Sequence, residues 1–392
     1  MTWPRRQLPV YSPIGLRALG AGLTAAARNG AAARTDVLDV LHDRYPGADV
    51  ILTDSGTSAL ALALRAVGGS AAIPAYCCFD IATACDAAGI EPILYDLDPD
   101  TLAPDPESLR RALNAGARSV VVAHLFGVPV PMAPVRVAAA AAGAAVIEDA
   151  AQGSGASIDD RPLGGFGDLG ILSFGRGKGV TGGGGGALLV NADRYREAGR
   201  ALGGGLRAPA RFRPSKIIGT AAQWMLARPE IYGLPASLPF LGLGSTIYRR
   251  PWAPAGISAF SLGILRHTLR AEAMEAERRR SNAECLRDIL SRAGAAALPR
   301  ASDDASAVRA GYLRLPVLAE ADSRMRSTHA QALGILPSYP ESLVDLEGFR
   351  ERVINPADDF TGSRRLARSL VTFPTHSRLQ AGDFAAIERL LI

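Results

Sequence analysis

Lysine is the rarest basic residue of this chain: it occurs twice in 392 residues, at Lys178 and Lys216, against 41 arginines. A guanidinium stays protonated, whereas a lysine amine can lose its proton and attack a carbonyl carbon. Lys178 lies in the glycine-rich run SFGRGKGVTGGGGG, residues 173–186, where the backbone could approach a flat ligand closely. We therefore expect Lys178 to bond covalently to a carbonyl compound; the alternative is a solvated lysine in a flexible glycine turn.

The run around Lys178 is not the phosphate-binding loop of nucleoside triphosphatases. That loop would need glycine at position 172 and serine or threonine at position 179, where this chain has Leu172 and Gly179. Ser173 could instead donate a hydrogen bond to a phosphate group near the lysine. A triphosphatase is therefore disfavoured.

A candidate phosphate site lies earlier, in the run Ser55-Gly56-Thr57-Ser58. This run follows a short apolar strand and opens a helix, so that free backbone N–H groups and the helix dipole would favour an anion there. The hydroxyls of Thr57 and Ser58 could add hydrogen bonds. The alternative is an ordinary helix cap by serine or threonine.

A carboxylate follows another apolar strand in the run VIEDAAQ, residues 146–152. Asp149 could hold the nitrogen of a heteroaromatic ring protonated, and Gln152 could reach a phenolic oxygen of that ring. A structural turn or a metal-binding acid is the alternative. A phosphate anchor, a ring acid and an imine-forming lysine are three requirements of one cofactor, pyridoxal 5′-phosphate (PLP).

One histidine, His124, ends a valine-rich strand and could touch a substrate; a packed or capping histidine is the alternative. The other four histidines show no metal-ligand spacing. The cysteines form neither a zinc pattern nor a disulfide framework; they are Cys77, Cys78, Cys85 and Cys285. We expect no metal site, and a reducing cytoplasm as the location.

Strand-like and helix-like segments alternate through the first half of the chain. Strands are predicted at 49–52, 70–73, 92–96, 119–123, 145–148, 169–174 and 187–190, with helices at 55–67, 80–88, 106–114 and 134–142. This alternation indicates the α/β class, with a mostly parallel seven-stranded sheet. The candidate residues then lie at the carboxyl ends of strands, where such sheets bind ligands.

The second half of the chain has an α+β pattern. Helices are predicted at 257–292, 319–333 and 382–392, and strands at 312–317 and 369–373. We expect an N-terminal arm (1–34), a large domain (35–255) with an apolar, insertion-like segment at 217–250, and a small α+β domain (256–392).

Composition narrows the choice of partners. The net charge of +5 is small for this length, so we do not expect nucleic-acid binding.

Residues 1–23 lack the apolar core of a signal peptide. The most apolar segment, 217–248, is broken by charges and prolines. We expect it to be buried or to cover a subunit boundary; the alternative is peripheral contact with the inner face of a membrane.

Taken together, the motifs resemble the DegT/DnrJ/StrS family of PLP-dependent sugar aminotransferases, which have the aspartate aminotransferase-like fold called fold type I. The matching stretches are SGTSAL at 55–60, PAYCCFDIATA at 74–84, DLDPDT at 96–101, HLFG at 124–127, IEDAAQ at 147–152 and SFGRGKGVTGGGGG at 173–186. Weaker similarity continues at LPSYPESL (336–343) and FPTH (373–376).

The resemblance implies cofactor contacts for the residues found above. They are the covalent bond for Lys178, the ring nitrogen for Asp149, the ring hydroxyl for Gln152, and the phosphate for Thr57, Ser58 and Ser173. In the family, an aromatic side chain after the proline at position 74 stacks on the ring. Phe79 is the aromatic candidate here, because the aligned position holds Cys78.

The chain also departs from the family pattern. Many members carry an Asn-x-Arg-x-Ser segment that reaches the partner subunit's active site, whereas this chain has GISAFS at 256–261. The aspartate usual after the H-x-x-G turn is missing from residues 128–132. Substrate recognition is therefore expected to differ from that of typical members.

The resemblance implies a homodimeric aminotransferase that moves an amino group from an amino acid, expected to be L-glutamate, to a nucleotide-linked keto sugar. Surface-polysaccharide or secondary-metabolite biosynthesis is the expected setting. One alternative is a lyase or desulfurase of the same fold, the latter with Cys77 or Cys78 as its reactive thiol. Another is a non-catalytic regulator that binds PLP or a sugar without turnover.

Overall fold

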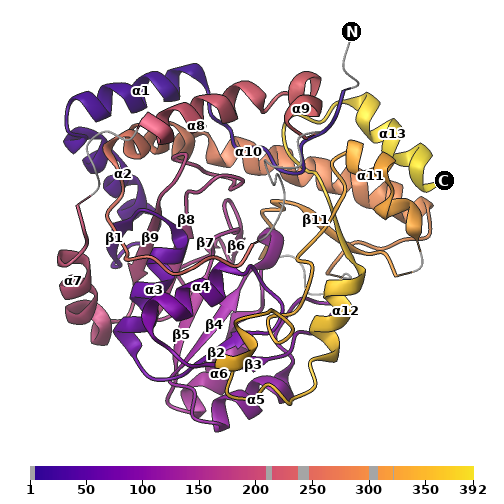
Figure 1. Cartoon of the computed structure of the whole chain (residues 1–392). Helices are drawn as coiled ribbons and strands as arrows, with labels where there is room; N and C mark the ends of the chain where they lie inside the picture. Colours follow the sequence, from indigo (N-terminus) through magenta and orange to yellow (C-terminus); the bar gives the residue numbers. More distant parts are fainter. Residues whose placement is uncertain (1–4, 209–213, 237–246, 300–307, 321) are drawn as a thin grey trace.

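A computed structural model describes residues 5–208, 214–236, 247–299, 308–320 and 322–392 (Figure 1). At its centre is a seven-stranded sheet with the spatial order β1 (Asp49–Thr53), β9 (Gly186–Val190), β8 (Leu169–Ser173), β5 (Ala145–Asp149), β4 (Ser119–Ala123), β2 (Ala71–Pro74) and β3 (Pro92–Tyr95). Strand β9 is antiparallel to both of its neighbours, and the other pairs are parallel. The predicted α/β fold with a mostly parallel seven-stranded sheet is confirmed.

Helices connect these strands and cover the sheet. Those of the large domain are α2 (Ala31–Arg44), α3 (Gly56–Val67), α4 (Asp80–Ala88), α5 (Pro106–Asn114), α6 (Met132–Ala141) and α7 (Arg196–Gly204). Two of them, α3 and α5, begin where the sequence supplies a cap, and so does the later helix after Ser258: the side chains of Ser55, Asp105 and Ser258 each accept a hydrogen bond from the backbone N–H three residues on. Such local bonds explain why the predicted and observed helix starts agree.

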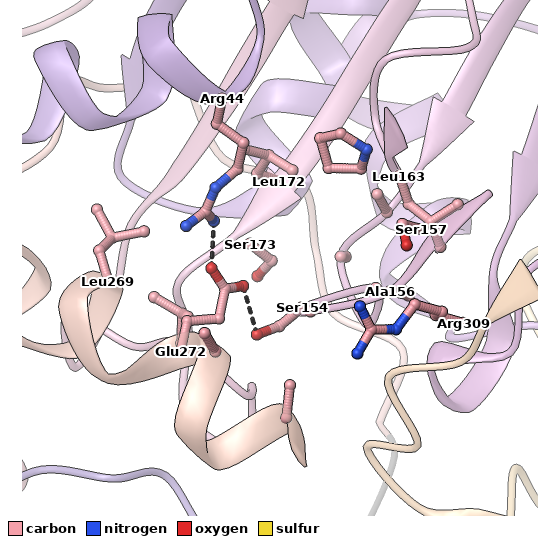
Figure 2. Close-up of a pocket in the computed structure, with 18 of the residues that line it drawn as sticks. Arg44, Ser154, Ala156, Ser157, Leu163, Leu172, Ser173, Leu269, Glu272 and Arg309 are labelled. Carbon is pink, nitrogen blue, oxygen red and sulfur yellow. Dashed lines mark hydrogen bonds and ion pairs between the residues drawn. The ribbon is translucent and has the colours of Figure 1, made fainter. Parts of the chain in front are cut away.

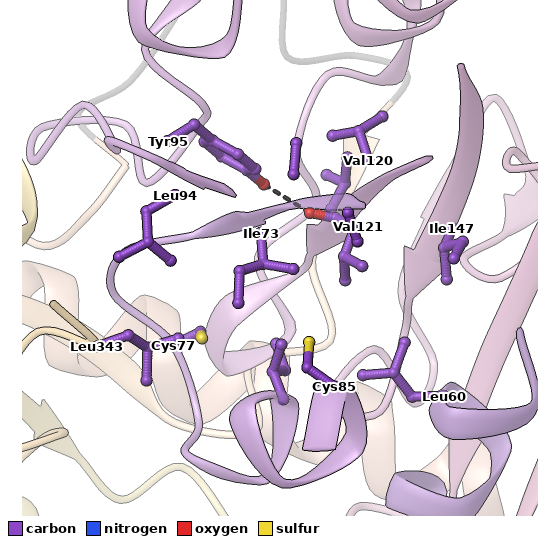
Figure 3. Close-up of a cluster of buried hydrophobic side chains, with 14 of the residues drawn as sticks. Leu60, Ile73, Cys77, Cys85, Leu94, Tyr95, Val120, Val121, Ile147 and Leu343 are labelled. Carbon is purple, nitrogen blue, oxygen red and sulfur yellow. Dashed lines mark hydrogen bonds between the residues drawn. The ribbon is translucent and has the colours of Figure 1, made fainter. Parts of the chain in front are cut away.

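The core beneath the site is apolar on both faces of the sheet. Figure 3 shows Leu60 of α3 facing Ile73, Val121 and Ile147 of three neighbouring strands. The buried Tyr95 hydroxyl donates to the backbone oxygen of Val121 at 2.7 Å. Close packing of this kind holds the carboxyl ends of the strands, and the loops that leave them, at fixed positions.

A single long helix, α10 (Ala259–Arg292), joins two cores. Its first half packs Leu265 and Leu269 against α2, and its second half packs Leu286 against a three-stranded antiparallel sheet. That sheet has the order β11 (Leu315–Leu318), β13 (Leu370–Phe373) and β12 (Leu336–Pro337), and α12 (Thr361–Ser369) and α13 (Ala381–Leu391) flank β13 in sequence. We propose that the small domain begins with α10, and that α2, which spans the expected boundary at residue 34, belongs wholly to the large domain.

The single helix predicted at 319–333 is not observed. The described residues there form a 3-10 helix, Ser323–Arg326, and a short helix, α11 (Thr328–Ala332). The Asp322 carboxylate accepts the N–H of Arg324 at 2.9 Å, and the Ser327 hydroxyl accepts that of Ala330 at 3.1 Å. These side-chain hydrogen bonds compete with the backbone hydrogen bonds of a continuous helix, so a new helical segment begins after each of the two residues.

The apolar segment predicted at 217–250 forms two helices, α8 (Pro214–Leu226) and α9 (Pro229–Ala236), and residues 237–246 lie outside the described part. Ile217 and Trp224 of α8 pack beside α1 (Leu16–Ala27) and the start of α10. Ile218 and Met225 are exposed. No helix among the described residues is long and apolar enough to cross a membrane.

Candidate active site

A small pocket at the carboxyl-terminal edge of the sheet brings together six of the residues that the sequence motifs single out. They are Thr57, His124, Asp149, Gln152, Ser173 and Lys178. Each comes from a different segment: the start of α3, the turn after β4, the end of β5 and the turn after it, the end of β8, and the glycine-rich loop. The parallel sheet explains the convergence, since the carboxyl ends of parallel strands share one edge.

One wall of the pocket is the first turn of α3. The N–H groups of Gly56 and Thr57 have no acceptor within the helix, because a helix leaves its first amides unpaired. Ser173 stands beside them. Ser58, in contrast, does not line the pocket: its hydroxyl donates to the Asp54 carboxylate at 2.6 Å, and its N–H is capped by Ser55. The wall is suited to a phosphate group, with Thr57 as its side-chain hydroxyl.

A substitution at Gly56 tests this wall. A Cβ there would lie 2.7 Å from Cβ and 2.9 Å from Oγ of Ser173, so Gly56→Ala must displace the helix start or the strand end. We expect PLP binding to weaken at least tenfold, because overpacking of this kind costs about 1–3 kcal/mol. Equilibrium titration with PLP measures the effect. Gly20→Ala, where an added Cβ meets nothing within 4 Å, is the control.

The loop that carries Lys178 is held from two sides. Ser12, near the N-terminus, accepts a hydrogen bond from the N–H of Gly177 at 3.0 Å and donates to the backbone oxygen of Lys178 at 3.3 Å. Thr181 donates to the backbone oxygens of Phe174 and Gly175. The glycine turn is therefore anchored on both sides of the lysine rather than free, which disfavours the alternative of a flexible loop.

Asp149 is a carboxylate with few protein partners. Its Oδ1 accepts the N–H of Ala151 at 2.9 Å, and the structure records no hydrogen bond to Oδ2 from the described residues. Burial raises the pKa of the Asp149 carboxyl, and the positive charge of Lys178 offsets this only in part. A cationic ring nitrogen beside the carboxylate would supply the missing partner and stabilise the ionised form. The residues present therefore fit PLP.

His124 is held at both ring nitrogens by the protein. Nδ1 accepts the N–H of Val130 at 3.0 Å, so the ring proton belongs on Nε2, which lies 3.0 Å from Oε1 of Glu148. Nε2 thus donates to a buried carboxylate. This bonding matches the alternative of a packed histidine, although the ring also lines the pocket.

Glu148 organises the turn beneath the pocket. Its two oxygens accept the backbone N–H groups of Gly164, Phe166 and Gly167 at 2.6–3.0 Å in addition to the His124 ring. Burial alone would raise the pKa of this carboxyl, but the histidine and the amides outweigh burial and lower it below its usual 4.5. The carboxylate is therefore a structural acceptor that stays ionised.

The low pKa of Glu148 predicts an acid-dependent stability. Because the pKa is lower in the folded state, the stabilisation is complete above about pH 4.5 and is lost as the pH falls through the folded-state pKa. Glu148→Gln places an N–H₂ group against the N–H donors that the carboxylate now accepts. We expect this to lower the free energy of unfolding by about 3 kcal/mol at pH 7 and by less at acidic pH. Urea unfolding at pH 7 and pH 4 measures both. Equal losses at the two pH values would contradict the assignment, and Glu107→Gln, on the surface, is the control.

Gln152 has both ends of its amide engaged. Oε1 accepts the N–H of Phe126 at 2.9 Å, and Nε2 donates to the hydroxyl of Tyr339 at 2.7 Å. Sequence reasoning missed Tyr339 as a site residue, although it lies in the stretch LPSYPESL that resembles the family. Its ring stacks on Phe126, with centroids 6.0 Å apart.

Phe79, like Ser58, is an expected site residue that does not line the pocket. It is 2% exposed within the apolar core and does not line the pocket, whereas Cys78 does. The backbone of Phe79 has the helical conformation with which α4 begins, so the side chains of Cys78 and Phe79 point in different directions. The predicted aromatic stack from Phe79 is therefore corrected, and Asp80, the first residue of α4, joins Cys78 in the pocket wall.

A second cavity of about 410 Å³ adjoins the pocket, and Ala151 and Ser173 line both (Figure 2). Figure 2 shows Arg44 and Ser154 converging on Glu272, which accepts the Ser154 hydroxyl at 2.7 Å and forms an ion pair with Arg44. Arg44, Ser154 and Glu272 therefore satisfy one another. The residues with the chemistry identified above line the smaller pocket.

The fold is that of the fold type I PLP-dependent aminotransferases. The solved structure described as DesI in the presence of its TDP-sugar product superposes with a TM-score of 0.76 at 20% identity, covering 99% of this chain and 92% of that one. Residues 42–215, which include the first turn of α3, Asp149 and Lys178, match the DegT/DnrJ/EryC1/StrS aminotransferase family. This is the family that the motifs predicted, and the match covers less than half of the chain.

Two curated relatives show how far the similarity reaches. An L-glutamine:2-deoxy-scyllo-inosose aminotransferase of Streptoalloteichus tenebrarius is 29% identical over 263 residues, 66% of this chain and 56% of the relative. A protein named putative pyridoxal phosphate-dependent aminotransferase EpsN, of Bacillus subtilis, is 33% identical over 166 residues, 40% of this chain and 43% of the relative. The chain thus spans about half the length of the curated relatives it matches.

Proposed function

We propose that this protein is a PLP-dependent aminotransferase that transfers an amino group from an amino acid to a keto sugar, in surface-polysaccharide or secondary-metabolite biosynthesis. The observation that carries the proposal is the meeting of Lys178 and Asp149 in one pocket, one wall of which is the amino-terminal turn of α3. The match of residues 42–215 to the aminotransferase family supports the same reaction.

In this proposal each residue has a separate task. Gly56, Thr57 and Ser173 hold the phosphate of PLP, and Asp149 keeps the ring nitrogen protonated. When bound, PLP supplies an aldehyde that condenses with amines and a ring that takes up the electrons of a broken bond. The Lys178 amine carries the cofactor at rest and, once freed, removes the proton from the α-carbon of the amino donor.

Gln152 and His124 are proposed to position rather than react. The amide of Gln152 is fixed by Phe126 and Tyr339, so it presents a constant surface beside the ring hydroxyl. His124 is fixed by Val130 and Glu148 and presents its ring to the pocket. Because these side chains are oriented before a substrate binds, the substrate can meet the lysine without a rearrangement of the pocket.

The proposed substrates follow from the relatives. One acts on a keto cyclitol with L-glutamine according to its name, and a structural neighbour holds a TDP-sugar. We propose a keto sugar, linked to a nucleotide, as the acceptor. L-glutamate and L-glutamine are both tested as donors, with L-glutamate as the expectation from the sequence.

The desulfurase alternative is not supported by the thiols. Cys77 is fully buried and donates to the Pro74 backbone oxygen at 3.4 Å, and burial raises its pKa well above the usual value. Burial also raises the pKa of Cys78 to about 12. Both thiols therefore stay protonated at neutral pH and are poor nucleophiles.

A half-reaction experiment tests the function and separates it from a regulator. The PLP-loaded protein is mixed with L-glutamate or L-glutamine, and the 2-oxo acid and the change in visible absorbance are followed. An aminotransferase releases one equivalent of 2-oxo acid per site and then aminates UDP- or TDP-linked keto sugars. Bound PLP with no 2-oxo acid from either donor would leave the regulator as the better description.

We also propose a homodimer, with the exposed face of α1 and α8 at or near the subunit boundary. Leu16 and Leu23 of α1 and Ile218 and Met225 of α8 are exposed there. Light scattering after size exclusion should give twice the chain mass.

Flotation with anionic liposomes tests the alternative of peripheral membrane contact at 217–248. The expected cytoplasmic location remains a prediction.

A further inference from the structure

The N-terminal segment of residues 5–14, which we call the strap, reaches the loop that carries Lys178. In Figure 1 it lies between the grey N-terminus and α1. Ser12 of the strap is 5% exposed, and its hydroxyl accepts the N–H of Gly177 and donates to the backbone oxygen of Lys178. One buried hydroxyl therefore holds a backbone group on each side of the lysine α-carbon.

The other end of the strap is bonded to three parts of the small domain. The backbone N–H of Gln7 donates to the oxygen of Ala332 in α11 at 2.8 Å, and its side-chain amide donates to the carboxylate of Asp383 in α13 at 2.7 Å. His376 follows β13, and its Nε2 lies 2.8 Å from the backbone oxygen of Leu8. The other ring nitrogen of His376 accepts a backbone N–H, so Nε2 carries the proton and donates it.

The stretch between these two ends is short and is itself held. Only three residues separate Leu8 from Ser12, and one of them, Pro9, has a fixed φ angle. Within this stretch Arg378 of the small domain donates to the hydroxyl of Tyr11 at 3.1 Å, and its guanidinium carbon lies 4.8 Å from the centroid of the Tyr11 ring. A shift of the small domain is therefore transmitted to Ser12 unless one of these bonds breaks.

We propose that Ser12 is a positioning residue for Lys178, and that the strap makes this positioning depend on where the small domain lies. Ser12 does not line the pocket, so it acts through the backbone of the lysine. A lysine side chain is long and flexible, and its reach is set by the place of its α-carbon. The consequence for amino transfer rests on the proposed function, whereas the anchoring of the loop does not.

The first test measures amide hydrogen exchange in the protein without PLP, by mass spectrometry of peptides from 173–186. Ser12→Ala should speed exchange at Gly177 about 3–10-fold, as expected for the loss of one hydrogen bond. Ser12→Thr keeps the hydroxyl and should restore the wild-type rate. Thr24→Ala is the matched control, because the Thr24 hydroxyl bonds only the backbone of its own helix on the surface.

The second test asks whether the small domain acts through the strap. Gln7→Ala removes the bond to Asp383 and should speed exchange in the same lysine-loop peptides, although Gln7 bonds the small domain and not that loop. The double variant Gln7→Ala/Ser12→Ala should exchange there no faster than Ser12→Ala alone, because both changes act through one path. Arg292→Ala is the control: it removes an exposed ion pair with Glu388 of α13 and leaves the strap bonded.

The third test uses the PLP-loaded protein. Ser12→Ala should lower the maximal rate of 2-oxo acid release from L-glutamate about 10–100-fold, because a small misplacement of the reacting group is enough for such a loss. The L-glutamate concentration that gives half the maximal rate should stay unchanged, since Ser12 does not line the pocket. Ser12→Thr should restore the rate. If Ser12→Ala does not fold, Ser12→Cys carries all three tests, because a thiol of similar size is a weaker donor and acceptor.

The outcomes separate this inference from the proposed function. A lysine loop that exchanges faster in Ser12→Ala, in a protein that releases no 2-oxo acid, supports the anchor and counts against the aminotransferase. Unchanged exchange in Ser12→Ala, or a rate that Ser12→Thr fails to restore, overturns the positioning role of the hydroxyl. If Gln7→Ala speeds exchange only in peptides of the small domain, the dependence on the small domain is overturned.

Discussion

Lys178→Ala will abolish the visible absorbance of the PLP-loaded protein and lower the rate of 2-oxo acid release by at least roughly 10³-fold, as expected when the group that moves the proton is removed. Lys178 lies in the pocket with Asp149 and has its loop anchored by Ser12 and Thr181. Lys178→Arg keeps the positive charge but cannot lose its proton or condense with an aldehyde. We expect it to be as inactive as the alanine variant.

The scarcity of lysine makes this prediction unusually sharp. Borohydride treatment of the loaded protein should leave PLP covalently attached to the peptide that contains Lys178. The only other lysine of the chain is Lys216. Peptide mass mapping therefore distinguishes two positions, and Lys216→Arg is the matched control, expected to retain the label at 178. A label on Lys216, or a Lys178→Arg protein that still transaminates, would refute the assignment.

Asp149→Asn is expected to have the second largest effect. The neutral amide cannot balance a protonated ring nitrogen, and leaving a buried charge without its partner costs about 3–5 kcal/mol. The rate of the half-reaction with the amino donor should therefore fall by roughly 10²–10³-fold, while Lys178 still takes up PLP. Stopped-flow absorbance measures the rate, and the visible band measures uptake.

Asp80→Asn is the matched control for Asp149, because both carboxylates line the same pocket. If proximity of any negative charge were sufficient, the two variants would lose similar activity. We expect Asp80→Asn to stay within about tenfold of the wild type. An Asp149→Asn protein within tenfold of the wild type would show that the ring nitrogen has another partner, and the assignment of Asp149 would then be withdrawn.

The two remaining alternatives differ from the aminotransferase in what they require of this pocket. A desulfurase requires a reactive thiol, but Cys77 and Cys78 are held protonated by burial. A regulator requires only binding, so release of a 2-oxo acid from an amino donor is the result that distinguishes an aminotransferase from it.

Much of the large domain could be predicted because its signals are local. Strands β4 and β5 are short apolar runs buried on both faces, and α3, α5 and α10 begin at residues whose side chains cap the next turn. The prediction failed at 319–333, where the caps at Asp322 and Ser327 stand inside an otherwise helical pattern. It also failed at Phe79, since the direction of two adjacent side chains depends on the conformation of the turn before α4.

The sequence by itself determined the α/β fold, the resemblance to the aminotransferase family and the candidates Lys178 and Asp149, because periodicity, caps and motifs act over a few neighbouring residues. Only the tertiary structure decided that Ser12 anchors the lysine loop across 165 positions, and that Tyr339 holds Gln152 across 187. These contacts depend on how the N-terminal segment and the small domain pack against the sheet, and no local pattern encodes that packing.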